Sequence, residues 1–253
     1  MNAIFNTVLG EASAITITSP QLKHSLEFYS TLGFAEVLNL PSGEVQVSDG
    51  SLLINLSPGK NSSLSLSYYS NNPADIFRKL GENIGNEGSP SDDISKNQPY
   101  TIRSPDGLEI NLLQLFPGIR HPAGPGMLSM SQDDYFNPDK YTNPVCGMFG
   151  ELAQPVSDLE KSADFWQKLG FSILSKFESP YPWAILSDGL QVIGLHQTRN
   201  FTQPAITYFA SDMKDKIENI RKKGVTEYTS KGSGNIVVMT PEKQHINLFR
   251  LGM

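Results

Sequence analysis

The sequence has little of what several large classes of protein require. Its 253 residues include a single cysteine, Cys146, so no disulfide can form within the chain. A lone thiol is typical of proteins in a reducing compartment. No run of 18 consecutive apolar residues is present, and the first residues lack the basic start and apolar core of a signal peptide. We therefore expect a cytoplasmic protein that does not insert into a membrane.

The chain also lacks an excess of basic residues. Lys and Arg number 20 against 26 Asp and Glu, which gives a net charge of −6, and the basic residues are scattered. A nucleic-acid surface would show them clustered, so we expect no nucleic-acid partner. The glycine-rich phosphate loops and the Gly-x-Ser-x-Gly nucleophile motif are absent as well. With 38% hydrophobic and 18% charged residues, the composition is that of an ordinary globular protein.

What the sequence does contain is an internal repeat. The phrase HSLEFYSTLGF at residues 24–34 returns as KSADFWQKLGF at residues 161–171, and its serines are 137 positions apart (162 − 25 = 137). Both phrases carry apolar residues at helical spacing followed by a glycine that ends the helix, which indicates a helix packed on a sheet. Ser19 followed by Pro20 predicts the start of the first helix, and Ser157 with Glu160 predicts a capping box for the second.

The repeat continues on both sides of these helices. AITIT at 14–18 and GELAQPV at 150–156 precede them, and each helix is followed by two apolar runs around Asp-Gly. Asp-Gly between apolar runs is a strong hairpin signal, in which we expect both residues to have positive φ. A further strand, a second helix and a closing hairpin follow in both halves. Each half therefore predicts β-α-β-β-β twice, with a first domain at 12–116, a linker at 117–145 and a second domain at 146–253.

This order of motifs resembles the vicinal oxygen chelate superfamily, the group of glyoxalase I, bleomycin-resistance proteins and extradiol dioxygenases. The resemblance covers nearly the whole chain. It implies an α+β fold of four tandem βαβββ modules that form two cup-shaped open β-barrels, with ligands bound inside the cups. The aromatic residues of the repeated phrases are then core residues of the scaffold.

Enzymes of this superfamily hold a divalent metal in the cup, with His and Glu ligands on four strands. The resemblance places these positions in the first half at Ala14, Asn55, about Ser65 and Asn111, and in the second half at Glu151, Gly194, about Ala205 and Asn247. One carboxylate and no histidine occupy them, and a neutral amide is a weak ligand for Zn, Ni, Mn or Fe. We therefore expect no metal cofactor, and we expect Asn55, Asn111 and Asn247 to hydrogen-bond a small molecule.

Two histidines keep an alternative open. His196 follows Gly194 by two residues and His245 precedes Asn247 by two, so each shares a strand face with a predicted site position. Glu151 and His196 are accordingly the candidates for a carboxylate–imidazole catalytic pair, and His245 is a further ligand-binding candidate. If a divalent metal is bound, its ligands are predicted to be Glu151, His196 and His245. The opposing interpretation places both histidines at the solvated rim.

Three functions therefore remain open from the sequence. The first is a metal-free protein that binds a small molecule in a cup. The second is a metal-dependent lyase or dioxygenase-like enzyme with an irregular site around Glu151 and His196 or His245. The third is a protein-interaction scaffold that has lost its site. Whether the chain is an enzyme stays open, and we expect a monomer or homodimer.

Overall fold

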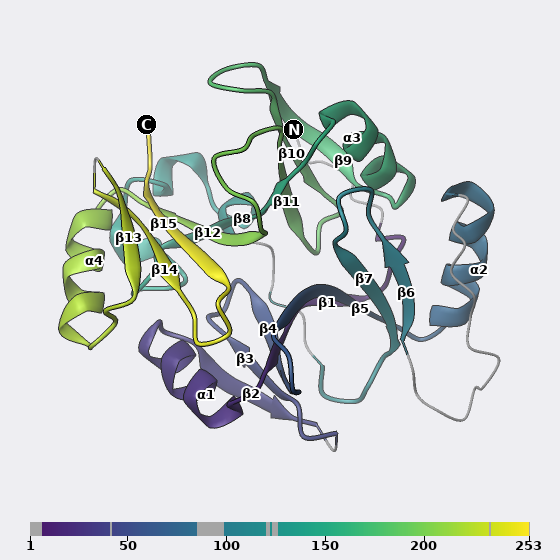
Figure 1. Ribbon diagram of the computed structural model, residues 1–253, viewed down its shortest axis with the longest axis horizontal. Helices are drawn as coiled ribbons and strands as arrows, with labels where there is room; N and C mark the ends of the chain where they lie inside the picture. Colours follow the sequence, from purple (N-terminus) through teal and green to yellow (C-terminus); the bar gives the residue numbers. More distant parts are fainter. Residues whose placement is uncertain are drawn as a thin grey trace. The chain divides into compact units, whose positions relative to one another are not determined.

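The computed structural model describes residues 7–40, 42–84, 99–119, 122, 126–232 and 234–252 (Figure 1). The elements of the first half are β1 (Ala12–Ser19), α1 (Leu22–Thr31), β2 (Ala35–Asn39), β3 (Val45–Ser48), β4 (Leu53–Pro58), β5 (Ser63–Ser70), α2 (Pro73–Ile84), β6 (Tyr100–Arg103) and β7 (Glu109–Gln114). Those of the second half are β8 (Met148–Pro155), α3 (Leu159–Lys168), β9 (Ser172–Phe177), β10 (Trp183–Ser187), β11 (Val192–His196), β12 (Ala205–Ala210), α4 (Met213–Lys222), β13 (Tyr228–Gly232), β14 (Asn235–Met239) and β15 (His245–Arg250).

The predicted α+β fold with tandem βαβββ modules is confirmed. Three modules show the complete order of elements, and in the module from β5 to β7 the residues 85–98 lie outside the described part. The strands form one sheet in the order β2-β3-β4-β1-β5-β7-β6 and another in the order β13-β14-β15-β12-β8-β11-β10-β9. Both sheets are mixed, because β5 pairs with β7 and β12 with β15 in parallel, and both are open.

The segment between the repeats forms three short 3-10 helices, η2 (Gly126–Ser129), η3 (Gln132–Asp134) and η4 (Pro138–Lys140). Residues 120, 121 and 123–125 of the predicted linker lie outside the described part. The predicted domain boundaries stay a prediction. Among the described helices, none combines the length and the apolar character that crossing a bilayer requires.

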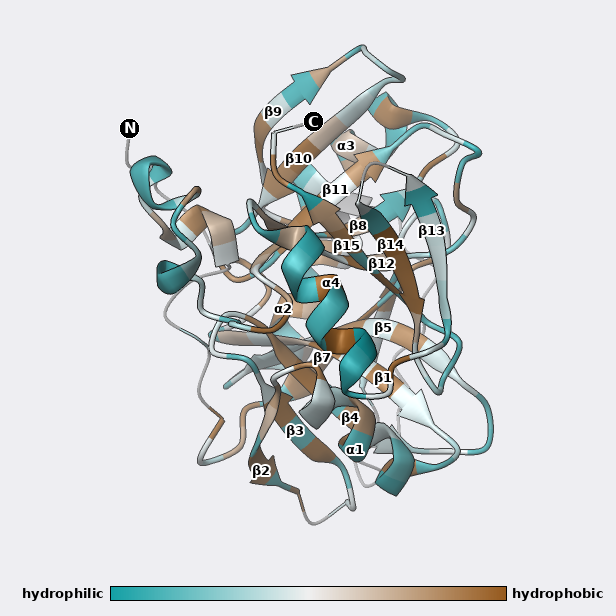
Figure 2. Cartoon of the chain, turned by 90° about the vertical axis from the view of Figure 1, so that its left-hand side faces the viewer, coloured by the Kyte–Doolittle hydropathy of each residue, from teal (hydrophilic) through white to brown (hydrophobic). Residues whose placement is uncertain are grey.

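The repeated phrases form α1 and α3, and their apolar stripes are buried in part: Phe28 and Phe165, predicted as core residues, are only half-buried. Tyr29 on α1 and Leu32, the residue that follows the helix, are fully buried, and Trp166 and Leu169 match them on and after α3. Both helices end where a glycine takes a left-handed conformation, with φ of 91° at Gly33 and 96° at Gly170. On the outer surface, α4 shows a largely hydrophilic face (Figure 2), while its apolar residues Met213, Ile217 and Ile220 are buried.

Both predicted helix starts were wrong. α1 begins at Leu22, beyond Ser19 and Pro20, and the Ser19 hydroxyl accepts the N–H of Gln21 in the turn before the helix. In α3 the capping residue is Asp158, whose Oδ1 accepts the N–H of Lys161 at 3.1 Å. Ser157 is not available as the cap, because its N–H and hydroxyl both donate to Asp106, which lies 51 positions earlier. A distant partner therefore overrode the local capping signal.

The Asp-Gly pairs do form the predicted hairpin turns, but the prediction of positive φ for both residues was wrong. Gly50 and Gly189 each have φ of 90°. Asp49 and Asp188 do not have positive φ, because Lys243 is the one non-glycine residue with positive φ in the part of the chain that the structure describes. Each aspartate instead uses Oδ1 to accept two backbone N–H groups of its own turn. The distances are 2.8–2.9 Å from Ser51 and Leu52 to Asp49, and 2.8–2.9 Å from Leu190 and Gln191 to Asp188.

Spatial contacts divide the chain into two units, each of which combines parts of both repeats. Unit 1 comprises Met1–Ile15, Ser65–His121 and Gln154–Thr202, and unit 2 comprises Thr16–Leu64, Pro122–Ala153 and Gln203–Met253. α2 and α3 therefore belong to unit 1, and α1 and α4 belong to unit 2.

The serine of each repeated phrase links the two repeats within a unit. In unit 2, the Ser25 hydroxyl of α1 donates to the buried carboxylate of Glu242, in the turn before β15. In unit 1, the equivalent Ser162 of α3 donates to Asp106, in the turn before β7. The repeated serine is thus explained by an acidic residue in the closing turn of the other repeat.

Candidate functional site

The second half carries a row of polar side chains on three neighbouring strands of unit 2. Thr207 on β12 lies opposite Glu151 of β8 and opposite Asn247 of β15. All three are buried, with exposed fractions of 5% for Glu151, 1% for Thr207 and 8% for Asn247. The side-chain amide of Asn247 donates to Thr207 Oγ1 at 3.0 Å. The structure therefore brings together two of the predicted site residues, Glu151 and Asn247.

Thr207 is the member of this row that sequence reasoning missed. The resemblance put the fifth-strand position near Ala205, whereas the parallel register pairs Ala205 with His245 and Thr207 with Asn247. The register between β8 and β12 shifts between Thr207, which pairs with Glu151, and Tyr208. Such bulges re-aim side chains and are frequent beside functional sites.

His245 begins β15 in the same unit, two residues before Asn247. Its pKa is lowered by partial burial and, to a lesser degree, by the positive charge of Lys231. Both effects favour the neutral imidazole, which can accept a proton or a hydrogen bond.

His196 belongs to unit 1, at the end of β11, and lies among aromatic rings rather than at a solvated rim. It is 8% exposed, its ring stacks on Trp183, and the Tyr181 hydroxyl is 3.4 Å from its Nδ1. Because Glu151 lies in unit 2, the predicted pairing of His196 with Glu151 stays a prediction.

The remaining predicted residues, Asn55 and Asn111, are held in separate hydrogen-bond chains. In unit 2, Gln46 Nε2 donates to Asn55 Oδ1 at 2.8 Å, and Asn55 Nδ2 donates to Thr16 Oγ1 at 3.0 Å. In unit 1, Asn111 accepts from Thr101 Oγ1 at 2.7 Å and donates to Ser65 Oγ at 3.2 Å. Gln46 was missed by sequence reasoning, although it directly faces Asn55 on the neighbouring strand.

These chains consist of neutral amides and hydroxyls, so they can orient hydrogen bonds but do not supply strong metal ligands. Glu151 is the single carboxylate among the site positions predicted for the two halves. Among the described residues, no three or more His, Cys, Asp or Glu side chains gather in an arrangement able to hold a metal ion.

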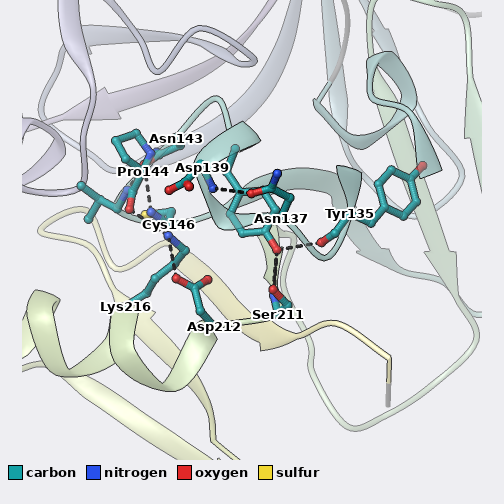
Figure 3. A network of polar contacts seen from close by, with 11 residues as sticks. Tyr135, Asn137, Asp139, Asn143, Pro144, Cys146, Ser211, Asp212 and Lys216 are labelled. Atoms are coloured by element: carbon teal, nitrogen blue, oxygen red, sulfur yellow. Dashed lines mark hydrogen bonds and ion pairs between the residues drawn. The ribbon is translucent and has the colours of Figure 1, made fainter. Parts of the chain in front are cut away.

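The sole cysteine is not a member of these rows and lies in the segment that leads into β8. Figure 3 shows this segment against the start of α4, where Lys216 donates to the carbonyl of Pro144 at 2.9 Å and pairs with Asp212 at 3.4 Å. Cys146 is fully buried here, and its thiol donates to the carbonyl of Leu32. Burial, followed by the nearby Asp49 carboxylate, raises the pKa of the thiol well above its ordinary value.

We expect Cys146 to be unreactive in the native protein, because the reactive thiolate is strongly disfavoured and no path leads to the sulfur without opening of the structure. Its reaction with Ellman's reagent should be at least about a thousandfold slower than that of a free thiol, and should accelerate across the urea unfolding transition. The control is the variant Ser42→Cys in a Cys146→Ser background, in which the thiol is exposed. Rapid native reaction of Cys146 would contradict the expectation.

No family model matches this chain, and no curated protein matches it. Solved structures do match. A variant of homoprotocatechuate 2,3-dioxygenase from Brevibacterium fuscum superposes with a TM-score of 0.59 at 12% identity, over 94% of this chain and 70% of that one. The 2,2',3-trihydroxybiphenyl 1,2-dioxygenase from Sphingomonas wittichii strain RW1 gives 0.56 at 12% identity, over 96% and 90%. The chain has the fold of the extradiol dioxygenases of the vicinal oxygen chelate superfamily.

The predicted resemblance is thus confirmed at the level of the vicinal oxygen chelate fold. Another variant of the Brevibacterium fuscum enzyme, solved in complex with HPCA, matches equally, with a TM-score of 0.59 at 12% identity over 94% and 70%. At this identity the likeness concerns the fold, and activity has to be argued from the residues that this chain carries.

Proposed function

We propose that the protein binds a small molecule on the Glu151–Thr207–Asn247 row, without the metal that enzymes of this fold family hold. The observation that carries the proposal is the composition of this row. Two of its members, Glu151 and Asn247, occupy predicted metal-ligand positions of the second half, yet the row offers one carboxylate, one hydroxyl and one amide, all buried. A polar cluster of this kind orients a ligand by hydrogen bonds.

The chemistry of the row favours a ligand that donates hydrogen bonds. The Glu151 carboxylate is an acceptor, while Asn247 has its amide N–H₂ on Thr207 and keeps a carbonyl-type oxygen as acceptor. Phenolic or alcoholic hydroxyl groups supply the matching donors. The complex of a similar dioxygenase with HPCA supports a small molecule as the kind of ligand.

The test is a thermal-shift screen of hydroxylated small molecules, including catechol and 3,4-dihydroxyphenylacetate, with and without EDTA, on protein purified without chelators. We expect substoichiometric metal and a stabilising shift that survives EDTA, because a ligand of the native state raises apparent stability. Glu151→Gln should weaken the affinity about tenfold, the effect of losing one hydrogen bond to a charged group. Glu36→Gln, on the exposed surface of β2 in the same unit, is the matched control.

The two alternative functions predict different results in the same experiment. Stoichiometric metal that is lost in Glu151→Gln would contradict the proposal and favour the enzyme with an irregular site at Glu151 and His245 or His196. A screen without any shift, together with a protein partner that co-purifies in stoichiometric amount, would contradict it in favour of the scaffold.

A further inference from the structure

Three aromatic rings stand in one row across β9, β10 and β11 of unit 1. Trp183 lies opposite Phe177 of β9 and opposite His196 of β11. The rings of Phe177 and Trp183 are 4.3 Å apart between centroids with an interplanar angle of 20°, and those of Trp183 and His196 are 5.7 Å apart at 4°. The three side chains therefore form a stack of near-parallel rings along the row.

Loop residues fix this stack from the side of His196. Tyr181 and Phe201 each contact the His196 ring edge to face, with centroids 5.9 and 5.6 Å away. The indole N–H of Trp183 donates to the carbonyl of Ser179 at 3.3 Å. The inner rings are thus held in place, which lowers the entropic cost of stacking a further ring.

The row lies on the face of the sheet that α3 does not cover. α3 packs on β9, β10 and β11, and the residues that alternate with the rings, Ala184 and Leu195, belong to the buried core. Side chains alternate between the two faces of a strand, so Trp183 and His196 project from the opposite face.

The stack ends at an edge of the sheet. β9 is the last strand in its order, and no further strand pairs with it among the described residues. Phe177 is 43% exposed, a large value for a phenylalanine. The terminal member of the row is therefore an accessible ring, backed by two rings that are held in place.

The repeat shows that this row is not a requirement of the scaffold. The Asp-Gly hairpins of the two repeats are 139 positions apart (188 − 49 = 139). In the first repeat, Glu44 is therefore the equivalent of Trp183, and Ser57 is the equivalent of His196. The first half forms the same hairpin and helix with polar residues at both places. The rings in the second half are therefore available for a function of their own.

We propose that this row, Phe177–Trp183–His196, is a second binding site that takes the planar aromatic ring of a small molecule as the next member of the stack at Phe177. Offset stacking between flat rings is the arrangement that the row already shows. The site lies in unit 1 and uses no residue of the Glu151 row, so this proposal does not depend on the function proposed above.

Isothermal titration of 2-naphthol into the full chain tests the site. We expect saturable binding, and binding at least about tenfold weaker for decahydro-2-naphthol, which has the same skeleton without flat rings. Phe177→Ala should weaken 2-naphthol binding about tenfold, the effect of losing one stacked ring. Ile173→Ala is the matched control, because Ile173 lies on the same edge strand with 38% exposure and should leave the affinity unchanged. Glu151→Gln should leave it unchanged as well, which separates this site from the other.

Three results would overturn the proposal. Equal weakening by Phe177→Ala and Ile173→Ala, or equal affinity for the flat and the saturated probe, would show a general apolar surface. Absence of 2-naphthol binding, together with a dimer in light scattering that Phe177→Ala converts to a monomer, would assign the exposed ring to self-association. Both substituted residues are exposed, and circular dichroism of each variant checks that the fold is retained.

Discussion

Replacing Asp49 with asparagine is expected to destabilise the protein by about 3 kcal/mol, whereas the same replacement of its repeat counterpart Asp188 is expected to stabilise it by about 1 kcal/mol. The two aspartates hold the same place in the two Asp-Gly hairpins, and both are buried, at 7% and 1% exposure. The opposite signs follow from what the second carboxyl oxygen meets in each unit.

In unit 2 both carboxylate oxygens of Asp49 accept hydrogen bonds. Oδ1 accepts the N–H groups of Ser51 and Leu52, and Oδ2 accepts the Tyr208 hydroxyl at 2.5 Å and the Asn143 amide at 3.1 Å. In asparagine one of the two oxygens is replaced by an N–H₂ group. In either orientation of the amide, this group would face the donors that Oδ1 or Oδ2 accepts in the aspartate. A buried group that loses such partners costs more than the bonds contributed, which explains the expected size of the loss.

In unit 1 the second oxygen of Asp188 has no donor. Neither Asp188 Oδ2 nor the hydroxyl of Tyr68, the counterpart of Tyr208, makes a hydrogen bond of normal geometry with any residue that the structure describes. The Tyr68 hydroxyl is nevertheless close enough to lower the pKa of Asp188, so the two groups are near neighbours without the well-formed bond that Tyr208 gives to Asp49. Burial raises the pKa of Asp188, and the N–H bonds from Gln191 and Leu190, followed by the Tyr68 hydroxyl, oppose this only in part. Asparagine removes the buried charge, keeps Oδ1 for the turn and offers an N–H₂ group to the Tyr68 hydroxyl.

The raised pKa of Asp188 also gives a pH dependence. Above its ordinary value of 3.8, the unfolded chain loses this proton before the folded chain does. Stability therefore falls as the pH rises from that value through the raised pKa of the folded state, because fewer protons are bound by the unfolded state than by the folded one. In Asp188→Asn this decline should be absent.

Urea unfolding followed by far-UV circular dichroism and by tryptophan fluorescence checks both expectations. Trp166 and Trp183 both lie in unit 1, so their fluorescence reports on the unit that contains Asp188. Amide hydrogen exchange around residues 45–56 reports on the hairpin of Asp49. The explanation would be refuted by a loss of stability in Asp188→Asn as large as that in Asp49→Asn.

These hairpins also show how far the sequence alone could reach. Asp-Gly between apolar runs predicts a turn from local chemistry, and the turn is present at both places. The donor to the outer oxygen cannot be predicted in this way, because Tyr208 is 159 positions from Asp49 and is brought to it by the fold. The same holds for Ser157, whose local capping signal was overridden by Asp106.

The candidate site likewise has residues that the sequence could predict and residues whose roles depend on the fold. Asn55, Asn111, Glu151 and Asn247 were predicted as site positions because the resemblance to the superfamily maps its metal-ligand positions onto them. Gln46 and Thr207 were missed because their roles depend on the register between strands, which composition does not determine. The position of His196 on its strand could be predicted, but the rings around it come from a neighbouring strand and from two loops.

The serine of the repeated phrase gives a second matched comparison. Ser25→Ala is expected to cost about 3 kcal/mol, because it leaves the carboxylate of Glu242 buried without this donor. Glu242 is 1% exposed, and its other oxygen already has no hydrogen-bond partner among the described residues. The charge of Glu242 also acts on Tyr29, whose pKa is raised mainly by burial and, after that, by this carboxylate.

Ser162→Ala removes the equivalent hydroxyl from α3 and is expected to cost only about 1 kcal/mol, the usual contribution of one hydrogen bond. Its acceptor Asp106 is half-buried and keeps both hydrogen bonds from Ser157, so the carboxylate stays satisfied. Adding Glu242→Gln to Ser25→Ala should recover part of the larger loss, because the buried charge is removed together with its donor. Equal losses in the two serine variants, or no recovery in the double variant, would show that the buried charge of Glu242 does not set the difference between the two repeats.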